Sequence, residues 1–82
     1  MRFMVEITFI PQHQSEIVTL VPQEQAHIKT LMEQGVVQAI YISADRSHVW
    51  VVMQGESQEH VQHEVQSFPL YPYMNVELTA LV

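Results

Sequence analysis

The chain lacks cysteine and is poor in positive charge, and each shortage excludes a class of protein. With no cysteine among its 82 residues, it can form neither disulfides nor thiolate zinc sites. Three Lys or Arg residues stand against nine Asp or Glu, which gives a net charge of -6. Nucleic acids and anionic membrane surfaces are bound through Lys and Arg, so we expect neither of them as a partner.

Long apolar runs are also missing, and only 15% of the residues are charged. No segment approaches the length needed to span a membrane, and the N-terminus lacks a basic-then-apolar signal pattern, so we expect a soluble, cytoplasmic protein. The length predicts a single domain over residues 1–82. A core this small favours further burial through oligomerisation.

Hydrophobic spacing divides the first half of the chain into a strand and a helix. Alternation over residues 2–10 predicts a strand with one clearly apolar face: Phe3, Val5, Ile7 and Phe9. Steps of three and four then predict an amphipathic helix over residues 15–34, terminated by Gly35. Pro22 allows two interpretations, a kink in this helix or the first turn of a separate helix.

The second half repeats the pattern of strands and a helix. Residues 36–43 and 48–54 are predicted strands that form a hairpin about the turn 44–47. Ser57 is a predicted cap for a second helix, which carries a narrow apolar stripe: Val61, Val65 and Phe68. A last strand is predicted over residues 75–82.

The resulting order, β-α-β-β-α-β, predicts an α+β, ferredoxin-like fold with an antiparallel four-stranded sheet and two helices on one face. The other face has no helix over it. This face is too apolar to leave in water, and its predicted residues are Met4, Glu6, Thr8 and Ile10 of the first strand, with Glu77, Thr79 and Leu81 or their neighbours of the last. We therefore expect a homodimer, or a higher homo-oligomer, formed through this face.

A loop near the C-terminus combines two prolines with aromatic residues. Its sequence is Phe-Pro-Leu-Tyr-Pro-Tyr-Met-Asn-Val-Glu-Leu over residues 68–78, and neither Pro69 nor Pro72 fits a helix interior or a central strand. Together with the opening Met1-Arg2-Phe3-Met4-Val5-Glu6-Ile7-Thr8, this loop resembles muconolactone delta-isomerase and its relatives. The resemblance covers nearly the whole chain.

The resemblance implies a ferredoxin-like domain that associates into a dimeric α+β barrel, with a pocket between sheet and helices. It also implies an isomerase reaction, a proton shift on a small unsaturated lactone or acid, which needs a base and a group that stabilises enolate-like charge. No metal or cofactor is required. A helix glutamate thought to act in proton transfer corresponds to Glu24.

The residues themselves also single out Glu24. It lies within the apolar stripe of its helix, where partial desolvation raises the pKa of a carboxylate and makes it a usable base. The alternative is that Pro22 opens a new helix and Glu24 only complements the dipole of the first turn.

Four aromatic residues are candidates for substrate binding, since they could line a pocket and orient a ligand: Tyr41, Trp50, Tyr71 and Tyr73. The alternative for these residues is a place in the core or a subunit interface. Glu6 and Glu77 form a second candidate site if a partner sheet encloses them.

Departures from the family pattern favour a second hypothesis. Active relatives carry a lysine one helical turn before the glutamate, where this chain has Val21, and Trp, His and Arg along the second strand, where it has Val37, Gln38, Ala39, Tyr41 and Ile42. Its only cations are Arg2, Lys29 and Arg46, so the sequence identifies no anchor for an acidic ligand and a more neutral ligand fits better. The alternative is a non-catalytic family member that binds a small hydrophobic or phenolic molecule or serves as a structural oligomer.

Two histidines raise a third, weaker hypothesis of a metal-binding module. His60 and His63 are spaced so that they can share a helix face. The apolar stripe turns them outward, which favours a solvated helix surface over a metal site.

Overall fold

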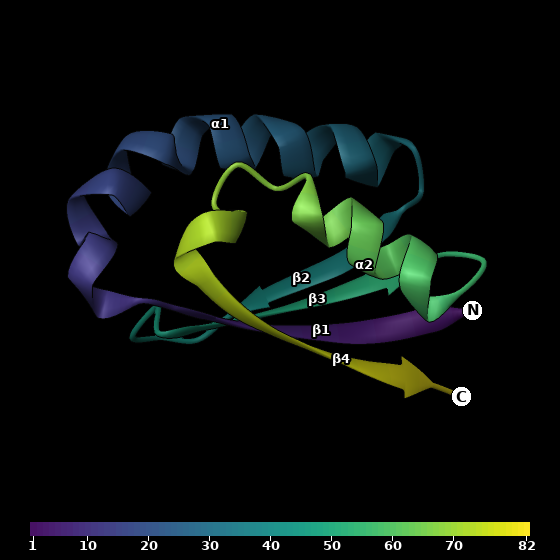
Figure 1. The fold of residues 1–82 in the computed structure, drawn as a ribbon. Helices are drawn as coiled ribbons and strands as arrows, with labels where there is room; N and C mark the ends of the chain where they lie inside the picture. The colour runs from purple at the N-terminus through teal and green to yellow at the C-terminus, as the bar shows by residue number, and fades with distance from the viewer.

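A four-stranded antiparallel sheet organises the structure, a computed structural model that describes residues 1–82 (Figure 1). Its central strands are β1 (Arg2–Phe9) and β3 (His48–Gln54), and its edge strands are β2 (Val37–Ile42) and β4 (Met74–Leu81). The strand order β2-β3-β1-β4, with every neighbouring pair antiparallel, confirms the predicted ferredoxin-like arrangement.

Both helices cover one face of this sheet (Figure 1). They are α1 (Gln14–Glu33) and α2 (Gln58–Gln66), and two short 3₁₀ turns, η1 (Pro11–His13) and η2 (Tyr71–Tyr73), precede α1 and β4. No helix of the chain has both the length and the apolar content needed to cross a membrane.

Helix α1 runs through Pro22 without a break, which decides between the two interpretations of that residue. Proline has no N–H to donate to the carbonyl of Val18, and helices commonly bend at such a position. Figure 1 shows the N-terminal part of α1 curving down toward the sheet. Glu24 therefore lies in the middle of a long helix, well past the first turn.

The C-terminal end of α1 confirms the predicted role of Gly35. This residue has φ of +80°, a left-handed conformation that glycine adopts without steric cost. The N–H of Gly35 donates to the carbonyl of Met32 at 3.1 Å, and that of Val36 donates to the carbonyl of Leu31 at 2.9 Å. These two bonds form a Schellman motif, which satisfies the last carbonyls of the helix.

Helix α2 begins as predicted. The Oγ of Ser57 accepts a hydrogen bond from the backbone N–H of His60 at 3.1 Å. Val61 and Val65 are buried against the sheet. The preceding Gly55 permits this close packing, because a Cβ built there would lie 2.7 Å from the Cγ2 of Val61.

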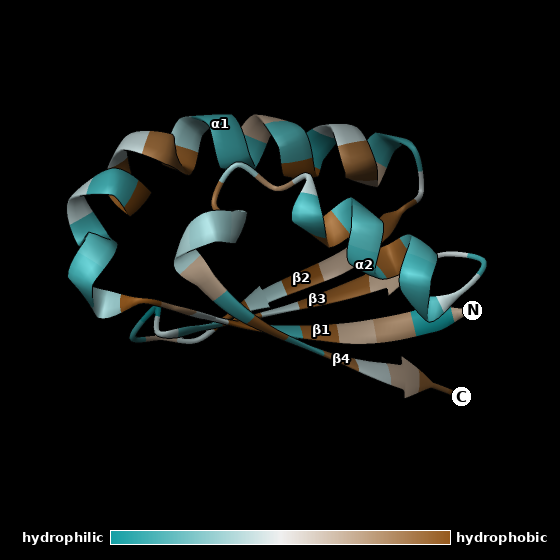
Figure 2. Ribbon diagram, in the orientation of Figure 1, coloured by the Kyte–Doolittle hydropathy of each residue, from teal (hydrophilic) through white to brown (hydrophobic).

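The core lies between the sheet and the two helices. Helix α1 mixes hydrophobic and hydrophilic residues, as burial of one side requires, whereas β2 and β3 are mostly hydrophobic (Figure 2). All of the buried residues are apolar: Phe3, Val5, Ile7, Ile28, Leu31, Val37, Val51, Met53, Val61, Val65, Phe68, Leu70 and Met74.

The opposite face of the sheet has no helix over it, as the sequence predicts. Strand pairing aligns one row of side chains across all four strands of this face: Tyr41, Trp50, Glu6 and Glu77. The prediction for Ile10 was wrong. β1 ends at Phe9, and Ile10 lines the cavity on the helix-covered side, because Pro11 starts η1 and turns the chain toward α1.

Candidate functional site

A cavity of about 590 Å³ lies between α1 and the sheet. The size suits a small organic molecule. Strands β1, β2 and β3 contribute apolar side chains on one side: Ile7, Ile40, Ile42, Val49 and Val51. Helix α1 contributes the opposite side, which includes Ile17, Val18, Val21, Ile28 and Met32. Of the 21 lining residues, 15 are hydrophobic, so the few polar groups among them stand out as candidates for chemistry.

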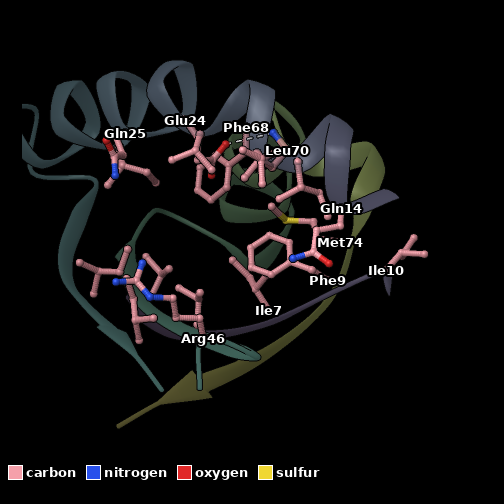
Figure 3. A pocket seen from close by; sticks show the side chains of 18 of the residues that line it. Ile7, Phe9, Ile10, Gln14, Glu24, Gln25, Arg46, Phe68, Leu70 and Met74 are labelled. Atoms are coloured by element: carbon pink, nitrogen blue, oxygen red, sulfur yellow. Dashed lines mark hydrogen bonds between the residues drawn. The ribbon is translucent and has the colours of Figure 1, made fainter. Parts of the chain in front are cut away.

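Glu24 is the one acidic residue in this lining. Its position in the apolar stripe of α1 leaves it half-buried, and Figure 3 shows its side chain beside Phe68 and Leu70. Burial raises the pKa of the carboxyl above its usual value, although the hydrogen bond from Leu70 and the nearby His27 act in the opposite direction. The structure thus agrees with the desolvation that the sequence predicts.

The proline–aromatic loop holds one oxygen of this carboxylate. The backbone N–H of Leu70 donates to Oε1 of Glu24 at 3.0 Å. Pro69 and Pro72 have no N–H, while those of Phe68, Tyr71 and Tyr73 donate to backbone carbonyls within the loop and the end of α2. Leu70 thus supplies the only N–H of this segment that donates to a side chain, and Oε2 makes no hydrogen bond.

His27 joins α1 to the same loop. Its Nε2 lies 2.9 Å from the Oγ of Ser67, whose hydroxyl donates to the carbonyl of Glu64 at 2.5 Å. Since that hydroxyl proton is already used, Nε2 of His27 carries the proton and donates to Ser67. The ring also packs edge-on against Phe68, with centroids 5.8 Å apart. These contacts fix the loop relative to Glu24.

Two cationic side chains also line the cavity, Lys29 from α1 and Arg46 from the β2–β3 turn. The sequence did not identify either of them as a cavity residue. Neither forms an ion pair, since the two close charged pairs in the chain are His13–Glu16 and His60–Glu64. Figure 3 shows Arg46 on the strand side of the cavity and Glu24 on the helix side.

The turn that carries Arg46 has unusual backbone geometry. Arg46 has φ of 63°, the only positive φ at a non-glycine residue. Asp45 stabilises this turn: its Oδ1 accepts from the hydroxyls of Ser43 and Ser47 at 2.7 Å and from the N–H of Ser47 at 3.0 Å. Those hydrogen bonds lower the pKa of Asp45 to about 2. Sequence spacing identifies the turn, but nothing in it reveals where the Arg46 side chain points.

The four predicted aromatic residues do not line the cavity that contains Glu24. Tyr41 and Trp50 lie on the uncovered face of the sheet, where Trp50 stacks on His48. Tyr73 packs against His13 of η1, and Tyr71 borders a separate cavity of about 280 Å³ beside α2 and β4. Their role in ligand binding stays a prediction, and the large cavity gives it no support.

The histidines of α2 lie at the surface. His60 and His63 are both exposed, as the apolar stripe predicts, and His60 lies 4.0 Å from Glu64 across one helical turn. No three His, Asp or Glu side chains are grouped closely enough to hold a metal ion.

The comparisons with known proteins give one family match and several matches in fold. A family model described as muconolactone delta-isomerase matches residues 1–82. Among solved structures, 5-chloro-2-hydroxyhydroquinone dehydrochlorinase from Burkholderia phenoliruptrix AC1100, in complex with 2,5-dihydroxybenzoquinone, superposes with a TM-score of 0.82 at 14% identity. That match covers 100% of this chain and 94% of the other. A crystal structure of muconolactone isomerase matches with a TM-score of 0.81 at 23% identity, over 99% of this chain and 88% of the other. No curated protein sequence matches the chain.

Proposed function

The chain belongs to the muconolactone delta-isomerase family, and we propose that it catalyses a proton shift on a small unsaturated lactone or acid. The observation that carries this proposal is the half-buried carboxylate of Glu24 in an apolar cavity, with one oxygen held by Leu70 and the other free. A proton shift needs a base that removes a carbon-bound proton and returns it to a nearby carbon. Such chemistry requires neither a metal nor a cofactor.

In this proposal each carboxylate oxygen of Glu24 has a separate role. Leu70 fixes Oε1 and so sets the direction of the side chain, which leaves Oε2 to take the proton from the substrate. Because burial raises the pKa of Glu24, its protonated form is accessible and can return the proton. The apolar walls reduce the contact of water with the charge that develops between the two steps.

A Glu24→Gln variant tests this role, with muconolactone as the first substrate and NMR in D₂O as the assay. The amide keeps an acceptor for Leu70 but cannot act as a base, so we expect turnover to fall by about 10²–10⁴-fold. Glu33→Gln is a matched control, since it removes the same charge from an exposed position of the same helix. Equal turnover in Glu24→Gln and wild type would exclude Glu24 as the base.

The second candidate function is non-catalytic binding of a small hydrophobic or phenolic molecule. Val21 lines the cavity at the position where active relatives carry a lysine, and most of the lining is apolar. The related dehydrochlorinase structure holds 2,5-dihydroxybenzoquinone, so this fold accommodates a small ring. Saturable binding of that compound, without turnover of any lactone or unsaturated acid tested, would favour this candidate over the enzyme.

We further propose that two copies associate through the uncovered face of the sheet. This face carries Trp50 beside Tyr41, which is 58% exposed, and no element of the chain covers it. Light scattering at micromolar concentration should give a dimer or larger assembly, and Trp50→Glu should shift it toward the monomer by placing another acid beside Glu6. His63→Glu adds the same charge on exposed α2 and should not change the assembly. A monomeric wild-type protein would refute the proposal.

A further inference from the structure

The distribution of positive charge is the least expected feature of the cavity. The chain has three Lys or Arg residues and a net charge of -6, yet two of these three residues, Lys29 and Arg46, line the same cavity. The walls around them are mostly apolar, and neither residue forms an ion pair with a carboxylate. A cation at the edge of an apolar cavity, without an internal partner, is suited to pair with an anion that enters with a ligand.

The backbone of Arg46 separates it from an ordinary turn residue. A residue with φ of 63° is most often Gly, Asn or Asp, because a Cβ there lies too close to the following carbonyl oxygen and only the short polar side chains of Asn and Asp compensate locally. Three hydrogen bonds to Oδ1 of Asp45, together with the bond from the Arg46 N–H to the carbonyl of Ser43 at 2.9 Å, hold the turn in this shape. Backbone strain that the surroundings maintain is typical of functional sites.

We propose that Arg46 is the anion anchor of this cavity, so that the ligand is a small, largely apolar molecule with one carboxylate or comparable anionic group. This inference rests on the proposed function, because it names the class of substrate on which Glu24 acts. It reverses the sequence-based expectation of a more neutral ligand. The guanidinium holds the anionic end on the strand side, and the apolar part of the molecule then lies toward α1 and Glu24 (Figure 3).

Arg46 is a better anchor than Lys29 for two physical reasons. A guanidinium binds a carboxylate through two parallel N–H donors, whereas an ammonium is a mobile, strongly hydrated point charge. Both side chains are exposed, but Arg46 lies on the strand side of the cavity, opposite Glu24, whereas Lys29 lies on the same helix as Glu24. We therefore expect Lys29 to contribute through long-range attraction only.

The test compares binding of benzoate with binding of its neutral isostere benzamide, followed by protein-observed NMR titration. Wild type should prefer benzoate by about tenfold or more, which is the usual strength of a hydrogen bond to a charged group. Arg46→Gln should reduce this preference to near unity and leave benzamide binding unchanged. Arg2→Gln removes the same charge far along the sheet and should preserve the preference, and Lys29→Gln should weaken it by less than about threefold.

A thermal melt of Arg46→Gly separates loss of binding from loss of fold. Glycine accepts the positive φ without strain, so this variant should melt no lower than wild type while its preference for benzoate disappears. A preference that survives in Arg46→Gln, or the absence of saturable benzoate binding in wild type, would overturn the proposal.

The two proposals fail independently. If Glu24→Gln retains full turnover while the benzoate preference depends on Arg46, the anchor stands and the assigned base is wrong. If Glu24→Gln loses turnover while Arg46→Gln keeps the preference, the base stands and the anchor is wrong.

Discussion

Replacement of Glu24 by glutamine should make the protein more stable at neutral pH. Folding moves this carboxylate into an apolar cavity, and the net effect of its surroundings is to raise its pKa. A group whose pKa is higher in the folded state favours folding when protonated and opposes it when ionised. The stabilising contribution of the protonated acid is therefore lost as pH rises through the folded-state pKa of Glu24.

The size of the effect follows from partial burial. Glutamine keeps an oxygen that accepts the N–H of Leu70, so no buried donor is left unpaired. It removes the desolvation of a charge that solvent still partly reaches, which limits the gain to about 0.5–1 kcal/mol. For a domain of this size that corresponds to a Tm higher by about 2–8 °C.

Thermal melts of wild type and Glu24→Gln at pH 8 and pH 4 are the direct assay. The variant should be more stable at pH 8, and the difference should shrink toward zero at pH 4, where Glu24 is protonated. All other titrating groups are common to both proteins and cancel in the comparison. A less stable variant at pH 8, or a gap that is equal at the two pH values, would refute the reasoning.

Three further predictions concern the elements that surround the site. Ser57→Ala removes the cap of α2 and should lower the free energy of unfolding by about 1 kcal/mol in urea titrations. Ser57→Asp keeps a capping oxygen and should retain most of the stability of wild type. Gly35→Ala forces a Cβ into the left-handed region and should cost about 1–2 kcal/mol, unless the end of α1 rearranges and far-UV circular dichroism changes. Asp45→Asn weakens the hydrogen bonds of the turn and should lower the affinity for benzoate. Equal affinity in wild type and variant would show that binding by Arg46 does not depend on the Asp45 hydrogen bonds. Because the pKa of Asp45 is lowered to about 2, its contribution is present above the ordinary pKa of an aspartate and is lost as pH falls toward 2.

The fold was predictable because its signals are local. Alternation along β1, the glycine at the end of α1 and the serine cap of α2 each specify one element, and the order of elements leaves few arrangements. The one wrong residue and the one question that the sequence left open both fall at prolines. Pro11 ends β1 early and places Ile10 at the cavity. Pro22 lies inside α1, whereas the hydrophobic spacing alone allowed either one helix or two.

The site was predictable only in part. Glu24 could be identified as a candidate because its helical spacing puts a carboxylate in an apolar stripe, and this pattern can be read from the sequence alone. Arg46 could not be assigned, because the direction of a turn side chain depends on a φ of 63° and on bonds to Asp45. The Leu70 contact was equally hidden, since it joins residues 46 positions apart.

Three local rules of stability are broken within this small region. Pro22 interrupts the hydrogen bonding of α1, Glu24 buries part of a charge, and Arg46 adopts a backbone conformation suited to glycine. Elsewhere the chain obeys these rules, with a fully apolar core and no buried side-chain N or O atom without a partner. A sequence that is locally consistent except around one cavity is expected to have been selected for what that cavity does. Glu24 and Arg46 lie on opposite sides of that cavity, which supports the proposal that they act together on one ligand.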